Sequence, residues 1–179
     1  MEISELDISG LLVIKPQKYQ DERGFFMESF QANRYKEFIS LPFLQDNISV
    51  SKRGVTRGLH LQNLPSAQGK LVQVLHGSVV DVAVDLRKSS PTFGAHAMIE
   101  LSATNGLQFY IPPGFAHGFQ ALTDDTIFVY KCTDFYSAKD EITIRWDDPN
   151  LAINWPISPA TTSPKDELGI LFNEFNSPF

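Results

Sequence analysis

Large apolar residues take every second position between Val80 and Arg87, and this pattern constrains the fold more than any other feature. Valine and leucine take every second position, and Asp81, Ala83 and Asp85 stand between them. A period of two places alternate side chains on opposite faces of a β-strand. We therefore expect a strand with one buried face and one polar face.

Short apolar stretches separated by glycine and proline fill the middle of the chain. The stretches Lys70 to Leu75, Phe109 to Ile111 and Thr126 to Thr133 are rich in residues that favour strands. Helix signals are few: we expect a helix over Gln31 to Ile39 and a short turn after Pro164. The sequence thus predicts an all-β fold, an antiparallel sandwich or barrel with a few short peripheral helices.

The chain has 179 residues, the usual size of one domain. We find no internal repeat, low-complexity tract or linker. The residues from about 156 onward contain several prolines and serines and are interpreted as an irregular tail that wraps the barrel. We therefore predict a single domain over residues 1–179.

Charge and cysteine content narrow the partners and the compartment. The formal net charge is −6, so no general basic field exists to hold a nucleic acid, and an anionic ligand must meet a local basic cluster. The lone Cys132 cannot form an intrachain disulfide, which favours the cytoplasm. The N-terminus is acidic and no apolar run approaches the roughly 20 residues that span a bilayer, so we expect no signal peptide and no membrane anchor.

One motif points to a particular barrel. The segment from Gly106 to His117 has the spacing G-x5-P-x-G-x2-H and resembles the second signature of the cupin superfamily, which implies a jelly-roll barrel. The first cupin signature normally supplies two histidines and a glutamate to a metal. The matching segment, Gly54 to Gly77, contains His60-Leu61-Gln62 and no glutamate, and no two histidines of the chain are spaced i, i+2 or i, i+4. We therefore predict neither a catalytic metal nor another cofactor.

A longer series of motifs is more specific than the cupin pattern. The segments are DERGFFMESF (residues 21–30), QDNIS (45–49), GVTRGLHLQ (54–62), GKLV (69–72), SSPTFG (89–94), IPPGFAHGF (111–119) and WDDP (146–149). Their order and spacing, from about Gly10 to Asp166, resemble the dTDP-4-dehydrorhamnose 3,5-epimerase family. The resemblance implies a homodimeric, cofactor-independent isomerase that inverts C3 and C5 of dTDP-4-dehydro-6-deoxy-D-glucose, on the route to dTDP-L-rhamnose.

Inversion of a carbon next to a ketone requires a base with a pKa near neutrality, an acid on the opposite face and a cation or donor for the enolate oxygen. The resemblance implies that His60 is the proton acceptor, Tyr130 the proton donor and Lys70 the partner of the enolate. It also implies that Asp166 orients His60, although the family's usual Leu-Ser before this Lys-Asp pair is Ser-Pro here. Without the resemblance, these residues would be interpreted as a structural histidine, a core tyrosine, a rim lysine and a solvated aspartate.

The remaining positions carried over from the family contact the substrate. They are Arg23, Phe26, Glu28, Gln45, Asn47, Arg57, His117, Tyr136, Glu141 and Lys165. Arginine suits phosphate because it gives bidentate, charge-assisted hydrogen bonds, and the family tyrosine at position 136 stacks on thymine. For single charged residues such as Glu28, Glu141 and Lys165, solvated surface is the alternative.

Two spacings conflict with regular strands. Arg57 and His60 have opposite parity, so a regular strand would send them to opposite faces. Either Gly58 marks a bulge that re-aims one of them, which we favour, or Arg57 serves another pocket at a subunit interface.

The second conflict concerns the two tyrosines on one predicted strand. Tyr130 and Tyr136 share parity and would lie about 20 Å apart if that strand stayed straight. That distance is too long for a span from sugar to base, so we expect the strand to end or bend near Asp134.

Other functions stay open at this stage. An epimerase acting at C3 or C5 alone would use the same base and acid, so the motifs separate it poorly from the double epimerase. A metal-dependent cupin oxygenase or isomerase is a rival from another enzyme class. A non-catalytic sugar-binding cupin is the third, and it would not need the joint presence of the four catalytic candidates.

Overall fold

The computed structural model describes all 179 residues and is built almost entirely from strands. The strands are β1 (Glu2–Glu5), β2 (Leu12–Lys15), β3 (Lys18–Asp21), β4 (Gly24–Met27), β5 (Gln45–Ser51), β6 (Thr56–Gln62), β7 (Lys70–His76), β8 (Ser78–Asp85), β9 (His96–Ser102), β10 (Gln108–Ile111), β11 (Phe115–Ala121), β12 (Thr126–Cys132) and β13 (Glu141–Thr143). The helices are α1 (Ala32–Tyr35), α2 (Pro164–Glu167) and a 3-10 turn at Phe172–Glu174. No helix is long and apolar enough to cross a membrane.

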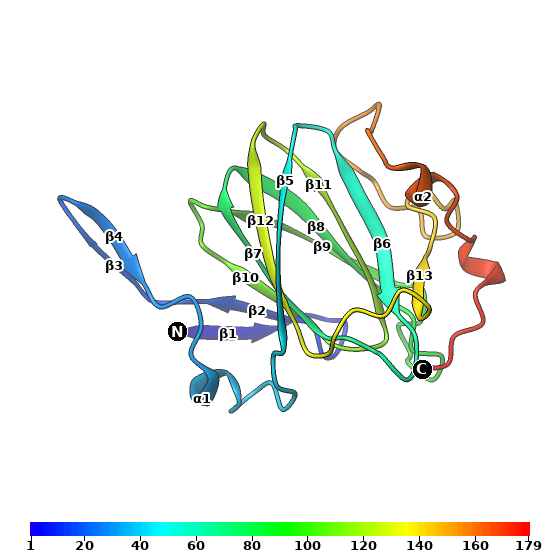
Figure 1. Ribbon diagram of the computed structural model, residues 1–179, viewed down its shortest axis with the longest axis horizontal. Coiled ribbons are helices and arrows are strands. Elements are labelled where there is room, and N and C mark those ends of the chain that lie inside the picture. The colour runs from blue at the N-terminus through cyan, green and yellow to red at the C-terminus, as the bar shows by residue number, and fades with distance from the viewer.

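Two antiparallel sheets lie face to face and form a jelly-roll sandwich (Figure 1). One sheet has the order β1-β2-β10-β7-β12-β5 and the other has the order β13-β6-β11-β8-β9. The hairpin of β3 and β4 pairs only with itself and projects away from both sheets (Figure 1). The all-β, cupin-type fold predicted from the sequence is confirmed.

The main core lies between the two sheets. Val72, Val74, Phe109 and Phe128 of the six-stranded sheet pack there with Phe119 of the five-stranded sheet. All five side chains are almost completely buried. Because β7 alternates, the residue that begins it also faces this interior, which brings a lysine to the mouth of the core.

The predicted strand from Val80 to Arg87 is confirmed as β8, which begins and ends two residues earlier in the chain. Its apolar face packs outward, where Val82 and Val84 join a cluster with Leu59. Its polar face is buried as well, because it lies between the sheets, and Asp81 is fully buried. The alternation therefore separates two buried environments rather than core and solvent.

The C-terminal segment covers the outer face of the five-stranded sheet. Trp155, Phe172, Phe175 and Phe179 pack against the cluster on that face. Figure 1 shows this segment, orange to red, running beside β6 and β13. The covering explains why the outward valines of β8 are buried, and it carries α2 to the edge of β6.

The two helix predictions have different outcomes. The short turn after Pro164 is present as α2. The helix expected over Gln31 to Ile39 is regular only over α1, where Gln31 caps the start by accepting from the Arg34 amide at 2.7 Å. Tyr35 and Ile39 then pack against the outer face of the six-stranded sheet.

Candidate active site

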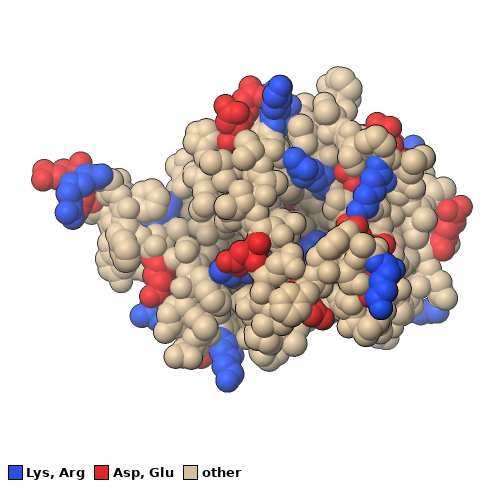
Figure 2. All heavy atoms as spheres, viewed as in Figure 1, with Lys and Arg blue, Asp and Glu red and all other residues tan.

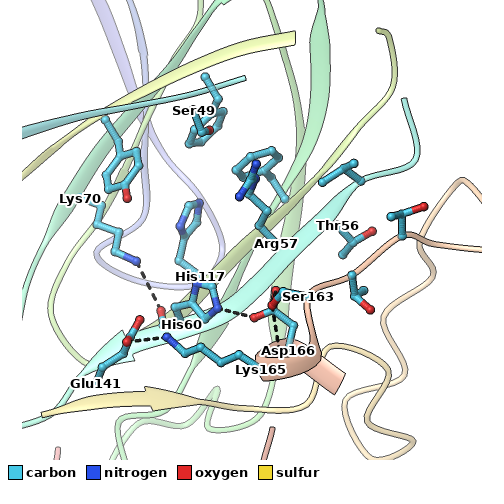
Figure 3. Close-up of a pocket in the computed structure, with 16 residues that line it drawn as sticks. Ser49, Thr56, Arg57, His60, Lys70, His117, Glu141, Ser163, Lys165 and Asp166 are labelled. Carbon is cyan, nitrogen blue, oxygen red and sulfur yellow. Dashed lines mark hydrogen bonds and ion pairs between the residues drawn. The ribbon is translucent and has the colours of Figure 1, made fainter. Parts of the chain in front are cut away.

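A pocket of about 430 Å³ opens between the sheets next to the main core, whose Phe119 and Phe128 help to line it. Its walls come from β5, β7 and β12 on one side, β6, β11 and β13 on the other, and the segment from Thr161 to Asp166. Figure 2 shows acidic and basic atoms side by side around a hollow on the face toward the viewer. Figure 3 shows the side chains of both sheets converging on this space.

His60 and Asp166 form a close pair at one wall. His60 Nε2 donates to Asp166 Oδ1 at 2.5 Å, and the Asp166 side chain is only 4% exposed. Ser163 holds the carboxylate from the other side, because its hydroxyl donates to Oδ2 at 2.9 Å and also caps α2. Burial alone would raise the pKa of Asp166, but hydrogen bonds from His60, Ser163 and the Gly58 amide lower it. The carboxylate is therefore held ionised against the imidazole.

A bulge in β6 brings Arg57 and His60 into the same pocket, as predicted. The register of β6 against β11 shifts by one residue between the two positions. Gly58 has a φ of +131°, and a Cβ at that residue would lie 2.5 Å from the Gly118 Cα. Only glycine fits this close approach of two backbones. Figure 3 shows both side chains pointing into one space.

Lys70 and Tyr130 approach from the opposite sheet. Lys70 Nζ donates to the His60 carbonyl at 3.4 Å, a long hydrogen bond across the pocket (Figure 3). Tyr130 lies on β12, next to the strand β7 that begins at Lys70, and its cross-strand neighbour is Val72. Burial lowers the pKa of the lysine and raises the pKa of the tyrosine. The phenol therefore keeps its proton at neutral pH.

His117 and Asp81 form a second histidine and aspartate pair at the floor of the pocket. His117 Nε2 lies 3.1 and 2.9 Å from the two carboxylate oxygens. The side chains are 7% and 0% exposed. Burial lowers the pKa of His117 and raises that of Asp81. Sequence reasoning identified the histidine but not its partner.

A smaller hollow adjoins the pocket on the side of β13. It shares His60, Lys70, Tyr130 and Glu141 with the main pocket and adds Gln45, Asn47 and Tyr136. The Tyr136 hydroxyl donates to Glu141 Oε2 at 2.8 Å, and Lys165 forms an ion pair with the same carboxylate. The strand carrying Tyr130 ends at Cys132, as expected from the spacing of the two tyrosines.

Three predicted substrate residues lie apart from this pocket in the single chain. Arg23 is 85% exposed and pairs with Asp21 on the projecting hairpin. Phe26, on the same hairpin, is 70% exposed. Glu28 pairs with Arg34 near α1. None of the three predicted residues lines either hollow.

Sequence reasoning missed three residues that the structure places at the site. Ser163 had a local signal, since serine followed by proline and an acidic residue is a helix start. Asp81 had none, because its contact with His117 depends on the register between two strands. Ser49 lines the pocket with a hydroxyl that is out of contact with water and has no hydrogen-bond partner. That orphan hydroxyl is not exposed to the pocket.

No group of three or more His, Cys, Asp or Glu side chains is placed to hold a metal ion. Each histidine of the pocket instead has one carboxylate partner and one ring nitrogen left over. Fold and site together define a jelly-roll enzyme of the cupin class that is equipped to move protons.

Comparison with known proteins identifies the family. The family model of dTDP-4-dehydrorhamnose 3,5-epimerase matches residues 5–174. The dTDP-4-dehydrorhamnose 3,5-epimerase of Shigella flexneri is 48% identical over 174 residues, 96% of either chain. The crystal structure of the dTDP-6-deoxy-D-glucose-3,5-epimerase of Legionella pneumophila Philadelphia 1, in complex with dTDP-4-keto-L-rhamnose, has a TM-score of 0.94 and 50% identity, covering 98% of this chain and 94% of that one. The chain belongs to the dTDP-4-dehydrorhamnose 3,5-epimerase family.

A more distant likeness bears on the number of carbons inverted. The 3'-monoepimerase ChmJ from Streptomyces bikiniensis, solved in complex with dTDP-quinovose, has a TM-score of 0.88 and 32% identity, covering 93% of this chain and 86% of that one. The fold thus accommodates single and double epimerases, and the chain is more similar to the double epimerases.

Proposed function

We propose that this pocket epimerises C3 and C5 of dTDP-4-dehydro-6-deoxy-D-glucose to give dTDP-4-dehydro-L-rhamnose, with His60 as base and Tyr130 as acid. One observation carries the proposal: the two residues stand on strands of opposite sheets and face one pocket. A flat sugar ring between the sheets has the base on one side and the acid on the other. Inversion needs that arrangement, since the proton leaves one face and returns to the other.

The proton balance of each step is simple. The ring nitrogen of His60 that does not bind Asp166 takes the proton from the carbon next to the ketone, and the C–H electron pair becomes the enolate. Asp166 stabilises the resulting imidazolium. The Lys70 ammonium holds the enolate oxygen, and burial strengthens that interaction. Tyr130 then donates its proton to the same carbon from the opposite face, and exchange with water restores both residues.

The nucleotide is assigned to the adjoining hollow and its rim. Arg57 can hold phosphate at the pocket wall, where Nε now donates to Ser51 Oγ at 3.2 Å. The exposed ring of Tyr136 can stack on the nucleotide base. The Tyr136 amide donates to Gln45 Oε1 at 3.0 Å. Lys165 supplies a further cation next to Glu141.

Deuterium incorporation tests the function. The protein is incubated with the dTDP-4-keto sugar in D2O without added metal, and C3 and C5 are followed by NMR. We expect deuterium and inversion at both carbons. Label at one carbon only would support the single epimerase, and exchange that a chelator abolishes would contradict the metal-free mechanism.

Two variants test the assigned roles. Tyr130→Phe should block inversion more than exchange, because the base still removes the proton. His60→Ala should stop both, by at least roughly a hundredfold as expected for loss of a positioned base. Equal and mild losses in the two variants would contradict the assignment.

We also propose a homodimer in which the hairpin of β3 and β4 reaches the partner's pocket. The hairpin exposes Tyr19, Phe25 and Phe26, and the outer face of β5 exposes Ile48 and Val50. Exposed apolar groups of this size indicate a covered surface. A second copy is the occupant we favour, because the substrate residues predicted on the hairpin lie apart from both hollows of the candidate active site in their own chain.

Mixing two inactive variants tests this arrangement. Light scattering should give twice the 20.1 kDa of one chain. Arg23→Ala and His60→Ala each impair the same site, but a mixed dimer contains one intact site if Arg23 comes from the partner. Recovery of activity on mixing supports the proposal, whereas a monomer or no recovery contradicts it.

For the compartment we propose the cytoplasm. Cys132 is buried and unpaired, which suits a reducing environment. Fractionation of cells that produce the full-length protein would test this, and recovery outside the cytoplasm would contradict it.

A further inference from the structure

The two histidine and aspartate pairs lie in a row across the five-stranded sheet. His60 and His117 are direct cross-strand neighbours on β6 and β11. Their carboxylates flank them on opposite sides, with Asp166 on α2 beyond β6 and Asp81 on β8 beyond β11. The arrangement gives each histidine the same chemistry, one ring nitrogen on a carboxylate and one left over. The proposed mechanism uses only the first pair.

The distances in the second pair indicate which atom holds the proton. Nε2 of His117 lies 3.1 Å from one oxygen of Asp81 and 2.9 Å from the other. A nearly equal pair of distances is what an N–H directed between two carboxylate oxygens gives. A protonated carboxyl would instead direct one O–H at the nitrogen, with one short contact. The two distances therefore favour Asp81 as the acceptor, with the proton of His117 on Nε2.

The ring of His117 is fixed in this orientation. It stacks on Phe128 with centroids 6.1 Å apart and an interplanar angle of 21°. His117 lines the pocket, and Nε2 is occupied by Asp81. Nδ1 forms no hydrogen bond within the protein and, unlike the orphan Ser49 hydroxyl, is not sealed from the pocket. Figure 3 shows the ring standing in the pocket beside His60 and Arg57.

We propose that Asp81 is a positioning residue: it holds the Nε2–H of a neutral His117, so that Nδ1 faces the substrate as a hydrogen-bond acceptor for a sugar hydroxyl. This inference rests on the proposed function. It adds to that function the tautomer of His117 and the residue that fixes it. Burial of His117 without a second partner favours the neutral ring. An acceptor at the floor would orient the sugar by a hydroxyl next to the carbon that His60 deprotonates.

The tautomer is directly measurable without substrate. Ring 15N shifts of the full-length protein distinguish Nε2–H from Nδ1–H, and His117→Gln assigns the signals. We expect Nε2–H in the wild type. In Asp81→Asn the side-chain amide can donate to Nε2, so the proton should move to Nδ1. An Nδ1–H or doubly protonated ring in the wild type would overturn the proposal, even if the variant failed to fold.

Kinetics supply the second readout. Asp81→Asn should lower kcat about 10- to 100-fold, since an acceptor facing the hydroxyl becomes a donor. If Asp81 acts through His117, the same substitution in the His117→Gln background should cost less than about threefold more. Multiplicative losses would show that Asp81 acts elsewhere and would overturn the proposal.

Asp85→Asn is the matched control, because Asp85 is a buried carboxylate on the same face of β8 outside the pocket. It should leave kcat and the His117 tautomer unchanged. Failure of the proposed function is separable: absent deuterium exchange in the wild type would contradict the function, while the ring shifts would still test the tautomer.

Discussion

Strand β8 carries two carboxylates on one face, and their surroundings differ in kind. Both Asp81 and Asp85 are fully buried. Asp85 accepts hydrogen bonds from the amide, Nε and Nη2 of Arg87 and from the hydroxyls of Ser90 and Thr92. Asp81 accepts only from His117.

The direction of the pKa shift follows the number of donors. Burial alone would raise the pKa of Asp85, but its donors lower it to about 2. At Asp81 burial outweighs the single histidine and raises the pKa. A carboxylate with many donors, such as Asp85, stays ionised near neutral pH, and its hydrogen bonds stabilise the folded state. A sparsely bonded one remains responsive to what enters the pocket. We infer that carboxylates at the pocket govern turnover and those beyond it govern stability.

Asp166→Asn is the strongest test of this division. The amide keeps the shape but can present the wrong atom to His60, so kcat should fall about 10³–10⁴-fold, as in other histidine and aspartate pairs. Unfolding free energy should fall by no more than about 1–3 kcal/mol, because the amide oxygen still accepts one of the three hydrogen bonds. Steady-state kinetics and urea unfolding measure the two quantities.

The control for this variant is Asp148→Asn. Asp148 is buried outside the pocket and accepts from the amides of Asn150, Leu151 and Phe172. The Asp148→Asn variant should have a lower free energy of unfolding and an unchanged kcat. The reverse outcome, an active Asp166 variant that unfolds easily, would break the comparison.

Asp85→Asn should show the opposite behaviour to a pocket variant. The pKa of Asp85 is about 2 when folded against an ordinary 3.8, so the charge stabilises the fold above pH 3.8. That contribution, on the order of 2 kcal/mol, is lost as the pH falls toward 2. Urea unfolding of both proteins should therefore differ at pH 7 and converge near pH 2. A constant difference, or a large loss of turnover at pH 7, would contradict the structural role.

Local patterns predicted much of the fold and of the site. The alternation in β8 depends only on nearest neighbours. The parity conflict between Arg57 and His60 left either a bulge or a second pocket for Arg57, and the favoured bulge is present. Glycine at position 58 located that irregularity, because close backbone contact with Gly118 leaves no room for a side chain. These features are set within a few residues of sequence.

Other features depend on contacts that sequence spacing does not determine. The pairing of Asp81 with His117 follows from the register of β8 against β11. The helix expected over Gln31 to Ile39 is short because such a segment depends on packing, and the Tyr35 hydroxyl is held by Gln108 at 2.7 Å. Arg23 lies apart from His60 because the hairpin of β3 and β4 projects away from the sandwich. The periodicity of the sequence does not predict the direction of that hairpin.

The smallest effect is expected at the rim. Lys165 is half exposed and already paired with Glu141, and such a pair is worth only about 0–1 kcal/mol to stability. If Lys165 also binds the diphosphate, Lys165→Met should raise KM roughly 3- to 10-fold and leave kcat unchanged, because a rim cation stabilises substrate and transition state alike. Lys15→Met removes a comparably exposed lysine, which pairs with Glu2 outside the pocket, and should change neither constant. An unchanged KM in the Lys165 variant would assign this lysine to the solvated surface, and a fall in kcat would extend the catalytic region beyond the two histidine pairs to the rim.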